Sequence, residues 1–200
     1  ELLRQAMIPV EASEASDCVY LAESQHNVCG DFASFFAAHG GSDVFGLPLT
    51  EQYIIGGMPV QYFERARFEW HAGAGGEADH VLLTRLGAAQ WYAQSGREID
   101  TPAVPIEDEG CLYEYSTGHN ICDEFAYHWV SSGSALTFGY PLTEAFDRDG
   151  LHLQYFERAR FELHHRADGT VDLVVAPLGL EEIEHLLSSG SNQDGTESGD

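Results

Sequence analysis

The chain has 200 residues, and its 33 acidic side chains stand against nine arginines and no lysine, which gives a formal net charge of −24. Binding to nucleic acid requires clustered Lys and Arg, so this composition argues against nucleic acid and against an anionic membrane surface as partners. No apolar run is long enough to span a bilayer, so we expect no membrane insertion. The first residue is not Met and no charged-then-apolar leader is visible, which indicates a processed mature chain or an excerpt.

A gap-free duplication organises the chain. Segment 18–69 aligns with segment 111–162, and roughly half of the aligned positions are identical. The identity is complete at 63–69 and 156–162, which both read Phe-Glu-Arg-Ala-Arg-Phe-Glu and are called the heptads below. A period this long indicates two copies of a small module rather than a solenoid of short units.

Composition places the boundaries of five parts. The stretch between the two modules is rich in Pro and acidic residues, and the last stretch contains mainly Ser, Gly and acidic residues, a composition typical of disorder. The parts are an N-terminal lead-in (1–17), module one (18–94), a linker (95–110), module two (111–188) and a tail (189–200).

Each module is expected to begin with a helix and to continue as a small antiparallel sheet, which makes an α+β fold. The apolar residues after Asn27 and Asn120 follow the spacing of one helix face, and Asn is a good residue to cap the start of a helix. Glycines at 40–41 and at 133 would end these helices.

A turn and a hairpin follow the first helix. Gly and Pro in segments 45–51 and 138–144 fix a turn. Each heptad then lies on a β-hairpin, with its charged residues near the turn, because β-favouring runs flank it. The expected last strands and closing helices are 81–83 and 86–92 in module one, and 171–175 and 178–187 in module two.

The four cysteines form one pair per module with identical spacing, and we predict the disulfides Cys18–Cys29 and Cys111–Cys122. Three pairings are possible, but only this one lets each module fold alone. Closing such a loop stabilises a module by roughly 2–3 kcal/mol. Disulfides imply an oxidising compartment outside the cytoplasm.

Metal binding is the alternative use of these cysteines. Two Cys and two His per module could hold zinc tetrahedrally, although the short Cys-Cys spacing of structural zinc sites is missing, so packed histidines and no cofactor are favoured. Calcium is a second possibility, at Asn192, Asp194 and Glu197 of the tail. The zinc candidates are Cys18, His26, Cys29 and His71 in module one, and Cys111, His119, Cys122 and His164 in module two.

The heptads contain four of the nine arginines. Paired arginines flanked by aromatic rings could bind a carboxylate or a sulfate. Both copies keep both Arg and both Glu, which favours internal ion pairing, so we predict a structural role. The residues concerned are Phe63, Glu64, Arg65, Arg67, Phe68, Glu69, Phe156, Glu157, Arg158, Arg160, Phe161 and Glu162.

Aromatic side chains on the surface are candidates for contact with sugars, because rings stack on the apolar faces of sugars. Leu163 replaces Trp70 in module two, so no platform is shared at this point, and core packing is the alternative for every ring. The candidates are Trp70, Trp91, Tyr92, Tyr140 and Tyr53.

The order Gly-His-Asn, aromatic helix, Gly-Gly, Phe-Gly-Tyr-Pro-Leu-Thr-Glu and then Gln-Tyr-Phe-Glu-Arg-Ala-Arg-Phe-Glu resembles a repeat of secreted and surface proteins of Chloroflexi-type bacteria. It is more distantly similar to the LGFP repeats of actinobacterial envelope proteins. The resemblance covers nearly all of both modules and implies an extracellular, non-catalytic module attached to cell wall or surface glycan. Module one departs at Ser24-Gln25, where module two has Thr117-Gly118, which argues against a ligand role of that turn in module one.

The expected function is attachment to a cell-surface or cell-wall polysaccharide. The alternative is a structural subunit of an extracellular filament or layer, in which copies of the chain contact one another head to tail. The sequence contains no nucleophile elbow, no phosphate-binding loop and no His-Glu-x-x-His helix, so we expect no enzymatic activity.

Overall fold

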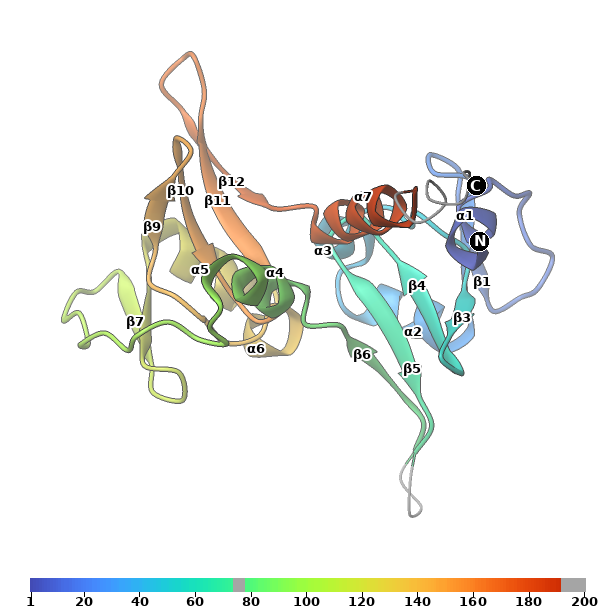
Figure 1. The fold of residues 1–200 in the computed structure, drawn as a ribbon, viewed down its shortest axis with the longest axis horizontal. Coiled ribbons are helices and arrows are strands. Elements are labelled where there is room, and N and C mark those ends of the chain that lie inside the picture. The colour runs from blue at the N-terminus through green and yellow to red at the C-terminus, as the bar shows by residue number, and fades with distance from the viewer. Residues whose placement is uncertain (74–77, 192–200) are drawn as a thin grey trace, which may run out of the picture.

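The computed structural model describes residues 1–73 and 78–191 (Figure 1). It consists of two similar halves, each with antiparallel sheets and helices, which confirms the α+β fold and the tandem repeat. The strands of module one lie in the right half of Figure 1 and those of module two in the left half. Among the described residues, no helix combines the length and the apolar character needed to cross a membrane.

A two-stranded hairpin that the sequence analysis missed begins each module. The hairpins are β1 (Cys18–Leu21) with β2 (His26–Cys29), and β7 (Cys111–Glu114) with β8 (His119–Cys122). Cys18 faces Cys29 in the first register and Cys111 faces Cys122 in the second. Both predicted disulfides are confirmed at these positions.

The first helix of each module starts later than predicted. The helices are α2 (Gly30–Ala38) and α5 (Asp123–Ser131). Asn27 and Asn120 are therefore strand residues and not caps, and no side chain caps either helix. The disulfide explains the delay, because a bridge across the hairpin needs Cys29 in extended backbone, with φ −126° and ψ 158°.

A four-stranded antiparallel sheet forms the centre of each module, and its strand order follows the sequence. Short helices, α3 (Gly41–Phe45) and α6 (Ser134–Thr137), lead into the predicted turns. The strands of module one are β3 (Tyr53–Ile55), β4 (Met58–Tyr62), β5 (Arg67–His71) and β6 (His80–Leu83). Those of module two are β9 (Phe146–Arg148), β10 (Leu151–Tyr155), β11 (Arg160–His165) and β12 (Val171–Val175). The heptads connect β4 to β5 and β10 to β11, as predicted.

One face of each sheet packs against the first helices around heptad phenylalanines. In module one, Phe32 and Phe36 of α2 belong to the same buried cluster as Phe63 and Phe68. The rings of Phe63 and Phe68 have centroids 4.3 Å apart, and both residues are fully buried. Module two repeats this cluster around Phe125, Phe156 and Phe161. Each buried phenylalanine contributes roughly 1.5–3 kcal/mol, so the heptad aromatics are core residues.

The closing helix of each module crosses to the other module. The two helices are α4 (Leu86–Ser95) and α7 (Leu178–Ser191). Trp91 of α4 packs on Tyr155 of module two, with ring centroids 5.5 Å apart. The Leu180 N–H of α7 donates to the Glu64 carbonyl of module one at 3.1 Å. Figure 1 shows α4 beside the strands of module two and α7 beside those of module one.

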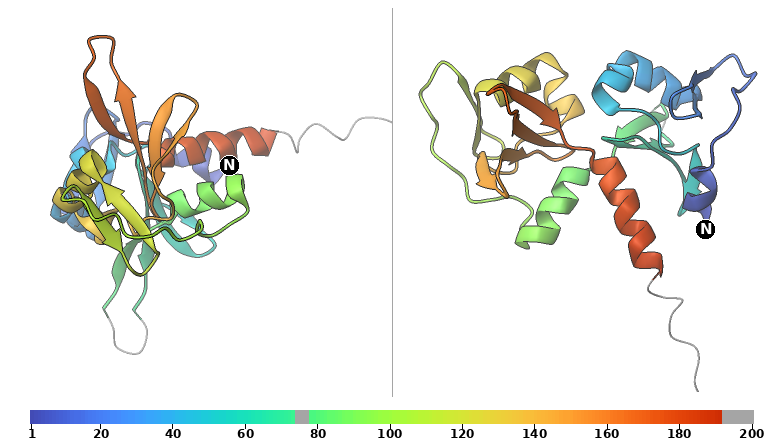
Figure 2. Two further views of the ribbon diagram at one scale, coloured as in Figure 1. Left: turned by 90° about the vertical axis from the view of Figure 1, so that its left-hand side faces the viewer. Right: turned by 90° about the horizontal axis from the view of Figure 1, so that it is seen from above.

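The helices themselves were predicted, but the expectation that each closes the module before it is wrong. An apolar helix face shows that the helix is covered and does not show which surface covers it. The two crossing helices lie side by side in the view from above in Figure 2. Gln90 of α4 donates to Glu181 of α7 at 2.5 Å. Leu86, Ala176 and Leu178 form a small buried cluster where the two chain segments cross.

The segments before the two hairpins are also equivalent. The Val10 N–H donates to the Gln25 carbonyl at 2.9 Å, and the Ala103 N–H donates to the Gly118 carbonyl at 2.8 Å. A short helix, α1 (Leu2–Ala6), precedes the first of these segments. The two-copy pattern therefore continues into the lead-in and the linker.

Candidate functional site

The charged side chains of the first heptad have partners inside the protein. Glu64 Oε2 accepts a hydrogen bond from the Leu47 N–H at 3.1 Å and so holds the Gly-Pro turn. Arg65 donates to the carbonyls of residues 42–44 in α3. Arg67 pairs with the last glutamate of the heptad at 2.6 Å. These contacts support the structural role predicted for the heptad.

The second heptad repeats the pattern and adds a contact to a closing helix. Arg158 donates to the Ala135 carbonyl at 2.9 Å. Arg160 pairs with Glu162 at 2.6 Å and with Glu181 of α7 at 2.9 Å. Burial disfavours the charge of Arg160, but hydrogen bonds to both carboxylates outweigh burial and raise the pKa of its guanidinium.

The turn of each heptad receives the closing helix of the other module. We call residues 63–66 helix-docking site one and residues 156–159 helix-docking site two. A Cβ on Gly179 of α7 would lie 2.0 Å from the carbonyl oxygen of Phe63, and a Cβ on Gly87 of α4 would lie 2.1 Å from that of Phe156. Only glycine permits this approach, which explains why both helices begin with Leu-Gly.

Charged side chains also meet where the modules face each other. Arg85 pairs with Glu157 of module two at 2.9 Å. Burial lowers the pKa of His128 in module two, and the positive charge of Arg65 in module one adds a smaller effect in the same direction. Arg65 and Arg158 line the same small space between the modules. Since both arginines donate to carbonyls beside it, this space is a packed interface rather than an anion site.

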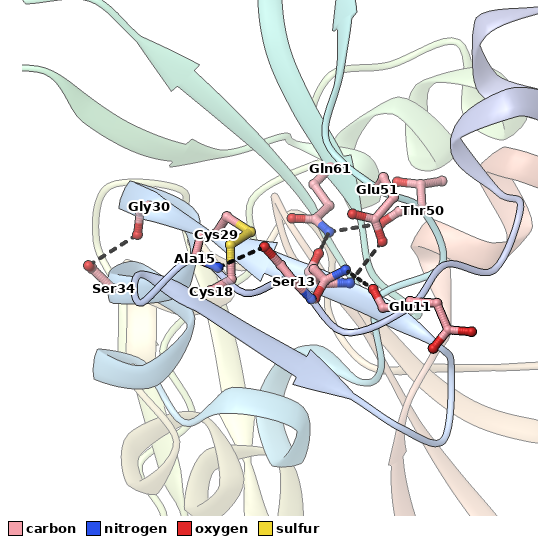
Figure 3. The surroundings of a disulfide bond; sticks show 11 residues. Glu11, Ser13, Ala15, Cys18, Cys29, Gly30, Ser34, Thr50, Glu51 and Gln61 are labelled. Atoms are coloured by element: carbon pink, nitrogen blue, oxygen red, sulfur yellow. Dashed lines mark hydrogen bonds between the residues drawn. A yellow bond between two sulfur atoms is a disulfide. The ribbon is translucent and has the colours of Figure 1, made fainter.

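A buried polar network joins the lead-in, the hairpin and the sheet of module one (Figure 3). The Asn27 side chain donates to the Glu11 carbonyl at 3.0 Å and accepts from the Ser13 N–H at 2.9 Å. Glu51 accepts the Asn27 N–H, and Gln61 donates to the Asn27 carbonyl, both at 2.8 Å. Module two has the same network around its own asparagine. An unpaired buried group costs about 1–3 kcal/mol, so these residues are structural.

The structure does not support the zinc hypothesis. All four sulfur atoms form disulfides and are not available as thiolate ligands. Residues 1–73 and 78–191 contain no group of three or more His, Cys, Asp or Glu that could hold a metal ion. The four candidate histidines pair with glutamates instead: His26 with Glu51, His71 with Glu69, His119 with Glu144 and His164 with Glu162. The calcium candidates Asn192, Asp194 and Glu197 lie outside the described residues.

Trp70 lies in an open groove of module one with a volume of ≈ 390 Å³. The indole Nε1–H donates to Asp31 Oδ2 at 2.7 Å, which fixes the ring beside the first turn of α2. The groove brings an aromatic ring together with carboxylates and an amide, which are groups that stack on sugar rings and hydrogen-bond to their hydroxyls. It is lined by Asp17, Cys29, Gly30, Asp31, Phe32, Gln52, Pro59 and Trp70. We call this surface the Trp70 groove.

Module two lacks this combination of side chains at the equivalent place. Leu163, Ala145 and Gly110 stand where module one has Trp70, Gln52 and Asp17. His152 replaces Pro59 and stacks on Phe125, with ring centroids 5.9 Å apart. Sequence reasoning identified Trp70 but missed Asp17, Asp31 and Gln52. The change to glycine and alanine in module two was a signal for Asp17 and Gln52, whereas Glu124 keeps an acidic group at the position of Asp31.

The other predicted sugar-contact residues lie elsewhere. Trp91 packs between α4 and the sheet of module two. Tyr53 stacks on Tyr62, with ring centroids 6.5 Å apart. Tyr92 and Tyr140 are exposed, but neither lines the Trp70 groove. Of the predicted aromatics, Trp70 therefore lines one groove and Tyr53 lines another, larger one.

A larger and mainly apolar groove of ≈ 850 Å³ lies between α1, β3 and the end of α7. Ile54 and Leu186 line it and are 48% and 40% exposed. Glu1, Arg4 and Tyr53 also line it, but the ring of Tyr53 already stacks on Tyr62, so the Trp70 groove is the stronger candidate.

No protein-family model matches the chain, and the search among curated proteins found no relative. Membership of the repeat family that the sequence resembles therefore stays a prediction.

Proposed function

We propose that this protein is a non-catalytic extracellular module that attaches to polysaccharide of a cell surface or cell wall, and that the Trp70 groove is its contact site. The observation that carries the proposal is the indole of Trp70, held by Asp31 in a groove that also contains Asp17 and Gln52. Such a ring binds the C–H face of a sugar, while the polar groups bind its hydroxyls.

The charge of the groove indicates the kind of sugar. Asp17 and Asp31 are both exposed acidic residues, and the whole chain has a formal charge of −24. Sulfated or uronic polysaccharides would be repelled by this field. The expected ligand is a neutral polysaccharide or one with free amino groups, whose ammonium would pair with a carboxylate.

The two disulfides support an extracellular location, because disulfides persist in oxidising compartments and are rare in the cytosol. One of them forms part of the binding surface, since Cys29 lines the Trp70 groove. Reduction would therefore alter the groove as well as the stability of the hairpin.

Binding to insoluble neutral polysaccharides and to purified cell walls, measured by pull-down and isothermal titration, tests the proposal. Trp70→Leu installs the residue that module two already has, so it is the best-matched disruptive variant. We expect it to weaken binding about tenfold, which corresponds to about 1.4 kcal/mol. Asp31→Asn keeps an acceptor for the indole and should weaken binding less, with the larger loss for amino sugars.

Tyr92→Ser is the matched control, because it removes an exposed aromatic ring of α4 that lies outside the groove. It should bind as tightly as the unmodified chain. Equal binding by Trp70→Leu, or failure of the folded unmodified chain to bind any polysaccharide, would overturn the proposal.

A further inference from the structure

We propose that helix-docking site one is a recognition site for the closing helix α7 of a second copy of this chain, so that two copies exchange α7 and form a dimer. This inference does not depend on polysaccharide binding. It rests on the way in which α4 and α7 exchange between the modules of one chain.

Docking is determined by local structure that is the same at both sites. Each helix places a glycine against the carbonyls of a heptad turn, at Gly87 and at Gly179. The backbone N–H of the residue after each glycine donates to a heptad carbonyl. Ala88 donates to the Glu157 carbonyl at 2.9 Å, and Leu180 donates to the Glu64 carbonyl at 3.1 Å. Nothing in these contacts requires the helix to come from the same chain.

The connection between β12 and α7 is short and local. It consists of Ala176 and Pro177, and the Leu178 N–H turns back to the Ala176 carbonyl at 2.8 Å. Module one repeats this turn between Leu86 and Thr84 at 2.9 Å. Within the described residues, each sheet contains strands of one module only. Undocking α7 therefore breaks helix contacts and leaves both sheets intact.

Undocked α7 would expose apolar side chains that are buried in the closed chain. Ile183 and Leu178 are each 1% exposed, and burying these apolar side chains again favours a docked helix. The helix therefore docks on helix-docking site one either of its own chain or of a second copy, and on undocking it gives up the bonds of Glu181 to Gln90 and Arg160. The short tether favours its own chain by an effective concentration in the millimolar range. We expect monomers in dilute solution and exchanged dimers at high protein concentration.

The test uses full-length chains with single cysteines on the two sides of the apolar groove. Ile54→Cys marks β3, and Leu186→Cys marks α7, and both positions line the same groove. The four native cysteines are all in disulfides, so only the new thiols react. A mixture of the two variants is unfolded in urea without reductant at about pH 4, where the new thiols stay protonated and do not attack the native disulfides. It is then refolded at high concentration and treated with a short bismaleimide at neutral pH. Exchange should give a covalent dimer of two 22.0 kDa chains.

Two matched controls fix the interpretation. The double variant Ile54→Cys/Leu186→Cys should cross-link within one chain when it is refolded at low concentration. Adding Gly179→Val to the Leu186→Cys chain should abolish the dimer, because its helix then fits neither copy. Monomers alone from the first mixture, with all variants folded by circular dichroism, would overturn the proposal.

A second measurement avoids the cysteine variants. The full-length Gly179→Val chain has an empty helix-docking site one, and a labelled peptide of residues 176–191 replaces the missing helix. Fluorescence anisotropy should show saturable binding at micromolar peptide, and the same peptide with the Gly179→Val change should not bind. The unmodified chain should bind the peptide at least tenfold more weakly, because its site is occupied. Equal binding of both peptides would also overturn the proposal.

Discussion

The two modules share their buried polar network and helix-docking geometry but differ at the Trp70 groove. Asn27 and Asn120 make the same contacts to the preceding segment, to a glutamate and to a glutamine. Trp70 and Gln52, in contrast, become Leu163 and Ala145 in module two. The two modules share the side chains whose loss would leave a buried donor or acceptor unpaired. They differ in side chains that face solvent. Positions that differ between the modules are therefore the better guide to binding.

The exchange of closing helices shows why neither module is complete by itself. In module two, Leu153 and Tyr155 face α4, and removing that helix would expose them. Module one receives α7 at its heptad turn, where Gly179 lies against the Phe63 carbonyl and the Leu180 N–H donates to the Glu64 carbonyl. Each module therefore contacts the closing helix of the other.

The largest predicted effect tests whether the two helix-docking sites are equivalent. Gly179→Ala and Gly87→Ala each add a methyl group about 2 Å from a backbone carbonyl oxygen. Each should lower the free energy of unfolding by about 3 kcal/mol or more, although alanine is the better helix former. Urea denaturation measures both. Glu184→Ala, at an exposed position of α7, is the control and should change stability by less than about 0.5 kcal/mol.

A large difference between the two glycine variants would show that one site holds its helix less tightly. If only Gly87→Ala lowered the free energy of unfolding, α7 would be dispensable for module one. The proposed exchange of α7 between copies would then have no basis.

The second prediction compares the two disulfides. Each closes a loop with a sequence separation of 11, so the chain-entropy model gives each about 2–3 kcal/mol. The paired variants Cys18→Ser/Cys29→Ser and Cys111→Ser/Cys122→Ser should therefore lower the free energy of unfolding by similar amounts, measured by urea denaturation. A markedly smaller loss in module two would show that its hairpin is held mainly by the polar network around Asn120.

Much of the fold was predictable because its signals are local. Cysteine spacing gave the disulfides, and the β-favouring runs around each heptad gave the central hairpin. The hairpin formed by β1 and β2 was missed because Val28 of β2 continues the apolar spacing of α2, and only the disulfide geometry places Cys29 in a strand. The crossing of α4 and α7 was missed because apolar periodicity shows only that a helix has a buried face. Tertiary packing determines which module buries that face.

The candidate site was predictable only in part. Trp70 is visible in the sequence as an aromatic residue that module two lacks. Its partner Asp31 is 39 positions away, on a helix whose start was predicted too early, so the two could not be placed together. Gln52 and Asp17 come from two further segments that the fold brings to the same groove.

The third prediction breaks the shared network in each module. Asn27→Ala removes the donor to the Glu11 carbonyl and the acceptor of the Ser13 N–H. Asn120→Ala removes the matching contacts to the Val104 carbonyl and the Ile106 N–H. Each variant should lower the free energy of unfolding by about 2 kcal/mol, because a buried side chain loses two hydrogen bonds of about 1 kcal/mol each. Thermal unfolding of the two variants measures this change. Unequal losses of stability would contradict the equivalence of the two networks.

The smallest predicted effect concerns a tyrosine that module two replaces by phenylalanine. Burial, and next the proximity of Tyr62, raise the pKa of Tyr53 from 10.0 to about 12, although Arg67 opposes the shift. Since the unfolded chain ionises this phenol first, its contribution to stability is complete below pH 10 and is lost as the pH rises toward 12.

Tyr53→Phe copies Phe146 of module two and should make the stability less sensitive to pH in that window. Urea denaturation at several pH values from about 9 to 12 measures the slope, and the ultraviolet absorbance of tyrosinate should show one late-titrating group fewer. Tyr92→Phe, at an exposed position of α4, is the control and should leave the slope unchanged. An unchanged slope in Tyr53→Phe would show that the tyrosine ionises equally in the folded and unfolded chains, and that the two modules do not differ in this respect.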